Sequence, residues 1–116
     1  MYVVIMGCGR VGSSLAASLT RIGHEVAVID RDQSAFLRLD LDFPGTKVLG
    51  MGFDRDVLVR AGIERADAFA AVSSGDNSNI IAARVARETF GVERNTITSS
   101  WPPAVVERRL AMLLDM

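Results

Sequence analysis

Residues 7–12 form a glycine-rich stretch whose residue types and spacing could hold a phosphate group: Gly7-Cys8-Gly9-Arg10-Val11-Gly12. This spacing matches the dinucleotide-binding fingerprint, in which the first glycine permits a tight turn and the second lets the backbone approach a pyrophosphate. The third lets a helix pack closely against a strand. A helix that starts here would direct unpaired N–H groups and the positive end of its dipole at the phosphates. We therefore predict that residues 7–12 bind the phosphate groups of a nucleotide.

A carboxylate that could bind a ribose follows at the expected distance. Asp30 lies 18 residues after Gly12, and the fingerprint places an acid about 20 residues further on. As an anion, Asp30 would repel a 2′-phosphate and so favours NAD over NADP, although the neighbouring Arg31 weakens that preference. The alternative interpretation is that Asp30 is a solvated acid in a turn.

Several residues in these turns have more than one interpretation. Arg10 could reach a phosphate or remain a surface arginine. Cys8 could be a reactive thiol, because a helix N-terminus lowers the pKa of a thiol, or a small residue that fits the turn. Ser73 and Ser74, together with Asp76, could cap a helix, contact the ligand, or do both.

Strands and helices alternate along the chain and would position these residues. Apolar runs predict strands, an apolar spacing of three and four residues predicts helices, and glycines and prolines mark their ends. The predicted strands are residues 2–6, 25–29, 47–49, 68–72 and 95–98. The predicted helices are residues 11–22, 33–42, a short helix capped by Asp54 and closed by Gly62, 77–89, and a last helix that starts at Pro102-Pro103.

This alternation predicts an α/β fold, a single Rossmann-like domain over residues 1–116 with a doubly wound parallel sheet. In the usual strand order 3-2-1-4-5, ligands bind beyond the carboxyl ends of the strands. Four turns should therefore converge on one site: residues 7–12, 30–32, 50–53 and 73–76. The third of these turns adds Met51, Gly52 and Phe53 to the candidate cofactor-binding residues.

The composition excludes several other classes of protein. The formal net charge is −1, so nucleic-acid binding through a basic surface is not expected. The single cysteine fits a reducing compartment, and no apolar run reaches the roughly 18 residues of a membrane span, so we expect a cytoplasmic protein without direct membrane insertion. The only lysine, Lys47, is not part of a P-loop.

The chain resembles the nucleotide-binding domain of Trk/Ktr-type potassium-uptake regulators, the RCK or TrkA-N domain, over about residues 1–98. The resemblance depends on the glycine fingerprint, Asp30, the turn at residues 50–54, the block at residues 61–67 and the pattern Ser73-x-x-Asp76-x-x-Asn79. It implies a non-enzymatic domain that binds NAD or NADH, or else ATP, ADP or AMP. It also implies a homo-oligomer at the inner face of the membrane, held there by a potassium-translocating subunit.

By the same resemblance, the phosphates would be held by Gly7, Gly9, Arg10, Val11 and Gly12. Asp30 and Arg31 would flank the adenosine ribose, and Ser73 would line the site. The family usually has an acid after Gly50, where this chain has Met51, and often an arginine near Ser99. Many relatives also carry a C-terminal ligand-sensing domain, and no such domain is expected within residues 1–116.

The alternative function is the cofactor-binding domain of an NAD-dependent dehydrogenase. Such an enzyme needs an acid or base at the hydride-transfer site, and the only histidine, lysine and tyrosine are predicted to lie elsewhere: His24, Lys47 and Tyr2.

An apolar stripe closes the chain, with Trp101 just before it: Val106, Leu110, Leu113 and Leu114. It could belong to the domain's own core or form an oligomer contact. Eight of the last twelve residues are apolar, which exceeds what a single core-facing stripe requires. We therefore expect a dimer or larger oligomer.

Overall fold

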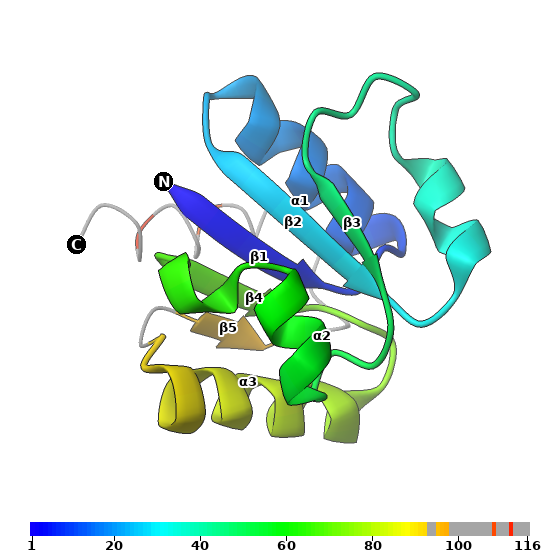
Figure 1. Cartoon of the computed structure of the whole chain (residues 1–116). Helices are drawn as coiled ribbons and strands as arrows, with labels where there is room; N and C mark the ends of the chain where they lie inside the picture. Colours follow the sequence, from blue (N-terminus) through cyan, green and yellow to red (C-terminus); the bar gives the residue numbers. More distant parts are fainter. Residues whose placement is uncertain (93–94, 98–107, 109–111, 113–116) are drawn as a thin grey trace.

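The computed structural model describes residues 1–92, 95–97, 108 and 112, and its centre is a parallel sheet with helices on both faces (Figure 1). The strand order is β3-β2-β1-β4-β5, and every pairing is parallel. The strands are β1 (Tyr2–Met6), β2 (Glu25–Asp30), β3 (Thr46–Leu49), β4 (Ala68–Ala71) and β5 (Asn95–Ile97). The predicted Rossmann-like fold and its strand order are therefore confirmed.

The sheet is buried on both faces, as its near-continuous apolar strands predict. In β1, Val3 and Ile5 point to one face, where α1 (Arg10–Arg21) and the 3-10 helix η1 (Gln33–Arg38) pack. The alternate residues Val4 and Met6 point to the other face. That face is covered by α2 (Arg55–Arg60), the 3-10 helix η2 (Ile63–Arg65) and α3 (Asp76–Phe90) (Figure 1).

The segment predicted as a helix over residues 33–42 is shorter and tighter than expected. Only residues 33–38 are helical, with 3-10 geometry, and Leu39 is already extended. The two buried side chains of this segment are Phe36 and Leu39, and Ala35 and Phe43 pack against the same core cluster with partial burial. Leu37 and Leu41 are exposed instead. Residues 40–42 are all exposed, so packing does not support further helical turns there, because most helix stability in proteins comes from a packed face.

The side of α3 that faces the sheet is made of small residues. Ala82, Ala83 and Ala86 are buried there with Asn79, whereas Ile80 and Ile81 are about half exposed. Small side chains let the helix axis approach the strands closely. This approach brings the first turn of α3, with Asn79, to the carboxyl end of β4.

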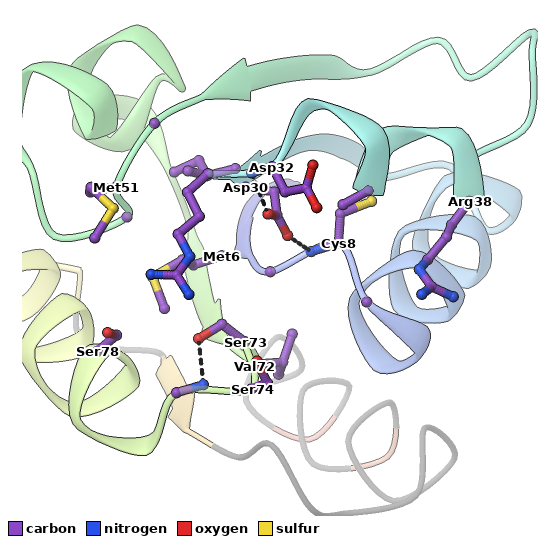
Figure 2. Close-up of a pocket in the computed structure, with 18 of the residues that line it drawn as sticks. Met6, Cys8, Asp30, Asp32, Arg38, Met51, Val72, Ser73, Ser74 and Ser78 are labelled. Atoms are coloured by element: carbon purple, nitrogen blue, oxygen red, sulfur yellow. Dashed lines mark hydrogen bonds between the residues drawn. The ribbon is translucent and has the colours of Figure 1, made fainter.

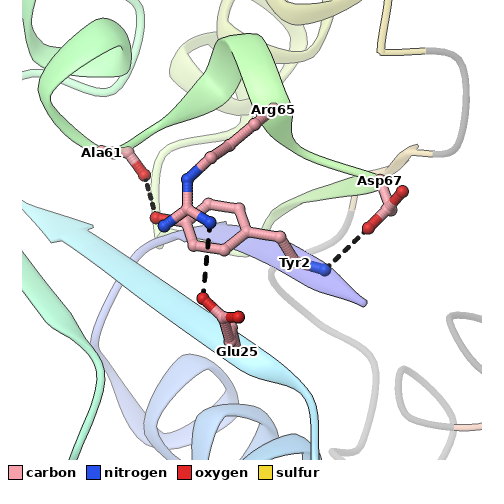
Figure 3. A network of polar contacts seen from close by, with 5 residues as sticks. All are labelled: Tyr2, Glu25, Ala61, Arg65 and Asp67. Atoms are coloured by element: carbon pink, nitrogen blue, oxygen red, sulfur yellow. Dashed lines mark hydrogen bonds and ion pairs between the residues drawn. The ribbon is translucent and has the colours of Figure 1, made fainter.

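A polar network joins segments at the amino ends of the strands (Figure 3). The Tyr2 hydroxyl donates to the Ala61 carbonyl, and the Tyr2 N–H donates to Asp67 at 2.8 Å. Arg65 lies over the Tyr2 ring, 3.9 Å from its centroid, and pairs with Glu25 at 3.4 Å. Both charged partners are largely exposed, so this ion pair contributes little to stability. The only tyrosine of the chain therefore has a structural role, in which it joins these segments.

The predicted last helix and its apolar stripe lie outside the described residues, apart from Arg108 and Met112, which are helical and exposed. The expected oligomer contact through Leu110 and Leu113 therefore stays a prediction. In the described part of the chain, no helix is both long enough and apolar enough to cross a membrane.

Candidate functional site

A pocket of about 760 Å³ lies at the carboxyl ends of β1, β2 and β4 (Figure 2). All four predicted turns contribute to it, and ten of the thirteen candidate residues line it: Gly7, Cys8, Gly9, Asp30, Arg31, Met51, Gly52, Phe53, Ser73 and Ser74. Arg10, Val11 and Gly12 do not line it. Sequence reasoning missed the contribution of η1, which adds Ser34, Ala35, Leu37 and Arg38. A helix was predicted there, but no sequence signal indicated that it would fold back over the site.

The three glycines of the loop are required for different reasons. Gly7 has φ of +111°, and a Cβ there would lie 2.7 Å from the backbone of Ser73. A Cβ at Gly12 would lie 1.7 Å from the carbonyl oxygen of Gly7. Gly9 differs, because its φ is −83° and a Cβ would meet nothing within 4 Å. The fold itself therefore needs glycine at positions 7 and 12 but not at position 9.

The N-terminus of α1 begins at this loop without a capping side chain. Gly9 is the N-cap, no side chain bonds to the first N–H groups, and the first turn contains no acid. The carbonyl of Gly9 is held by Ser13, whose N–H and hydroxyl donate to it at 2.9 and 2.7 Å. The positive end of a twelve-residue helix thus has no anion from the helix itself.

Asp30 connects three of the turns around the pocket. Its carboxylate accepts the N–H of Cys8 at 2.8 Å and the N–H of Asp32 at 2.9 Å (Figure 2). Its carbonyl accepts the N–H of Gly50 at 2.9 Å. The interpretation of Asp30 as a solvated turn acid is therefore incomplete, because the carboxylate holds the glycine loop and the start of η1 in place.

The start of η1 is fixed by Asp32. Its carboxylate accepts the N–H of Ser34 at 3.0 Å and the hydroxyl of Ser34 at 2.7 Å. These two hydrogen bonds lower the pKa of the Asp32 carboxyl, so the group stays ionised and the cap persists at neutral pH.

Ser73 is clamped by a fully buried amide. The side-chain oxygen of Asn79 accepts the N–H of Ser73 at 3.0 Å and its hydroxyl at 2.6 Å. The side-chain nitrogen of Asn79 donates to the Ser73 carbonyl at 2.9 Å. Since Gly7 packs directly against Ser73, this clamp also supports the glycine loop. Asn79 was noted in the sequence as part of a family pattern, and the structure shows what it holds.

The Cys8 thiol is buried, and burial together with the negative charge of Asp30 raises its pKa from 9.0 to about 11. Arg38 and Lys47 oppose this shift. The thiol stays protonated at neutral pH, which favours the interpretation of Cys8 as a small packing residue over that of a nucleophile.

The raised pKa of Cys8 predicts an alkaline loss of stability. Because the thiol holds its proton more tightly in the folded state, this contribution is complete below pH 9 and is lost as the pH rises towards 11. Urea unfolding between pH 8 and 11 should show a fall of up to about 2–3 kcal/mol that is absent from Cys8→Ala. Parallel stability curves for the two proteins would contradict the assignment.

Comparisons with known proteins identify the family of the region that forms this pocket. The family model of the TrkA-N domain matches residues 3–101. The chain is 70% identical, over 93 residues, to the Trk system potassium uptake protein TrkA of Streptomyces coelicolor; the match covers 80% of this chain and 42% of that protein. The chain thus spans less than half the length of this relative.

Two solved structures have a similar fold. The GsuK RCK domain superposes with a TM-score of 0.71 at 25% identity, covering 97% of this chain and 23% of that one. The Kef CTD of Shewanella denitrificans, described in its AMP-bound form, superposes with a TM-score of 0.69 at 15% identity, covering 99% of this chain and 92% of that one.

Proposed function

Because the chain belongs to the TrkA-N domain family, we propose that it is the nucleotide-sensing domain of a regulator of a membrane potassium channel or transporter. The region matched by the family model contains all the turns that form the pocket. The high identity to a potassium-uptake protein supports the same physiological role for this chain.

The observation that carries the proposal is the unobstructed backbone at Gly9. Neither strain nor packing requires glycine at this position, yet it lines the pocket at the uncapped start of α1. A glycine without a role in the fold is explained if a ligand approaches the backbone there. Because helix N-termini favour negative charge, that ligand is anionic, and a phosphate group fits.

The ligand that we propose is NAD or NADH, with ATP, ADP and AMP as alternatives. An ionised carboxylate has about four acceptor positions, and Asp30 uses two of them for the backbone N–H groups of Cys8 and Asp32. The remaining positions could accept the two hydroxyls of a ribose. The AMP named in the Kef structure supports an adenine nucleotide in this fold.

We propose that the domain regulates rather than catalyses. The alternative, a dehydrogenase cofactor domain, needs an acid or base beside the nicotinamide. His24, Lys47 and Tyr2 are not among the residues that line the pocket, and Tyr2 is engaged at the other end of the strands. Purified protein is accordingly expected to show neither hydride transfer nor phosphate release.

The same family membership supports a proposal about assembly and location. We propose a cytoplasmic homo-oligomer, a dimer or larger, that reaches the inner face of the membrane by binding a potassium-translocating subunit. Deletion of the gene in the source organism is expected to reduce or deregulate potassium uptake. Unchanged rubidium uptake in the deletion strain at limiting potassium would contradict this role.

A thermal-shift panel of NAD, NADH, NADP, AMP, ADP and ATP tests the binding function. A ligand at about one hundred times its Kd should stabilise the folded state by about 2.7 kcal/mol, or raise Tm by about 10 °C. Because Asp30 is anionic, NAD should shift Tm more than NADP at equal concentration. The absence of any shift with all six ligands at millimolar concentration would overturn the binding function.

A further inference from the structure

Two carboxylates and two guanidinium groups are among the described side chains that line the pocket, and the carboxylates have more interaction partners than the guanidinium groups. The carboxylates of Asp30 and Asp32 already accept two hydrogen bonds each, from backbone N–H groups and from Ser34. The guanidinium groups are those of Arg31 and Arg38. Within the described residues, neither of them forms an ion pair. The charge of Arg31 acts on the neighbouring carboxylate of Asp32, whereas Arg38 has no ion-pair partner among the described residues.

Arg38 is placed close to the glycine loop by the packing of η1. It is the last residue of η1, a segment held against α1 by Phe36 and Leu39. Figure 2 shows its side chain descending from η1 on the side of the pocket where Cys8 lies. The charge of Arg38 also lowers the pKa of the Cys8 thiol, which is consistent with this position.

A purely structural explanation of Arg38 is weak. A basic residue in the last turn of a helix interacts favourably with the helix dipole, but η1 has only six residues and its dipole is small. That interaction would also leave the long side chain free to extend into solvent. Instead, Arg38 lines the same pocket as Cys8 and Gly9, the residues directly before the uncapped start of α1.

We propose that Arg38 binds a phosphate group of the nucleotide, together with the N–H groups at the start of α1. This inference rests on the proposed function and assigns Arg38 a role that the sequence suggested for Arg10. Arg10 is exposed and does not line the pocket. A guanidinium group suits this role because its planar fork of donors matches two phosphate oxygens at once. Arg38 thus selects phosphorylated nucleotides over nucleosides.

The test compares Arg38→Gln with the unchanged protein by calorimetry, using AMP, ADP and adenosine as ligands. Loss of a charge-assisted hydrogen bond at an exposed site should weaken AMP and ADP binding about tenfold. Adenosine affinity should not change, because adenosine has no phosphate. Arg38→Lys should restore part of the loss, since it returns the charge but not the fork.

Arg87→Gln is the matched control. Arg87 is an exposed residue of α3 outside the pocket, so its removal changes the net charge equally without touching the site. If Arg38→Gln and Arg87→Gln weaken AMP binding equally, or if adenosine binding falls as much as AMP binding, the role of Arg38 is overturned while the nucleotide function stands. If the unchanged protein binds none of these three ligands, the role of Arg38 is overturned, and the thermal-shift panel with NAD and NADH decides the nucleotide function separately.

Discussion

Replacing Gly9 with valine is expected to abolish nucleotide binding while the domain remains folded. A Cβ at this position would meet no protein atom within 4 Å, and the backbone is extended with a negative φ of −83°, so no left-handed conformation excludes valine. The cost to the free protein should be about 1 kcal/mol, the penalty for valine at an N-cap. The valine methyl groups would occupy the space from which a phosphate reaches the first N–H groups of α1.

The expected loss of affinity is more than about a hundredfold, equivalent to two hydrogen bonds to a charged group. Calorimetry with the best ligand of the thermal-shift panel measures it, and circular dichroism with urea unfolding confirms the fold. Gly12→Ala provides the contrast, because its Cβ would overlap the Gly7 carbonyl oxygen at 1.7 Å. That variant should lose stability as well as binding. Unchanged affinity in a folded Gly9→Val protein would remove the central argument for the site.

Replacing Asn79 with alanine is expected to destabilise the domain by about 2–4 kcal/mol, a large part of the stability of a small domain. Three hydrogen bonds to Ser73 would be lost, and the N–H and carbonyl groups of Ser73 would be left without these partners. Asn79 is fully buried, so a cavity would remain as well. Because Gly7 packs on Ser73, we also expect weaker nucleotide binding in the fraction that folds.

Asn77→Ala is the control for this prediction. Asn77 is an exposed residue of the same helix, two positions before Asn79, and its truncation should change the unfolding free energy by no more than about 0.5 kcal/mol. Urea unfolding at 25 °C compares the two variants. An Asn79→Ala protein as stable as Asn77→Ala would show that the clamp on Ser73 is not needed.

Most of the fold could be predicted because the local signals agree with one another. The strand at residues 2–6, the glycine turn and the helix that follows differ from the predicted boundaries by at most one residue. Asp54 caps α2 through the N–H of Asp56 at 2.9 Å, as its residue type and place before an apolar run indicated. The prediction failed at residues 39–42, where apolar spacing alone does not show whether a packing surface exists for further turns.

The site was predicted in outline, since parallel strands bring their carboxyl ends to the same edge of a sheet. That rule placed the turns after β1, β2, β3 and β4 around one pocket without any knowledge of distances. It could not place residues of the next segment, so Ser34 and Arg38 were missed. Both enter the pocket because η1 packs against α1, and Phe36 belongs to the same core cluster as the buried residues of α1.

The sequence by itself determined the class of fold, the strand order, the family and the position of the glycine loop, because each depends on short-range spacing or on chain connectivity. Only the tertiary structure decided which glycine the fold does not require and which carboxylates already accept hydrogen bonds. It also decided which guanidinium group has no ion-pair partner among the described residues. Gly7, Gly9 and Gly12 look equivalent in the motif, yet their Cβ environments differ because Ser73 and the Gly7 carbonyl lie against two of them. These differences arise from atoms brought close by packing, and no spacing along the chain encodes them directly.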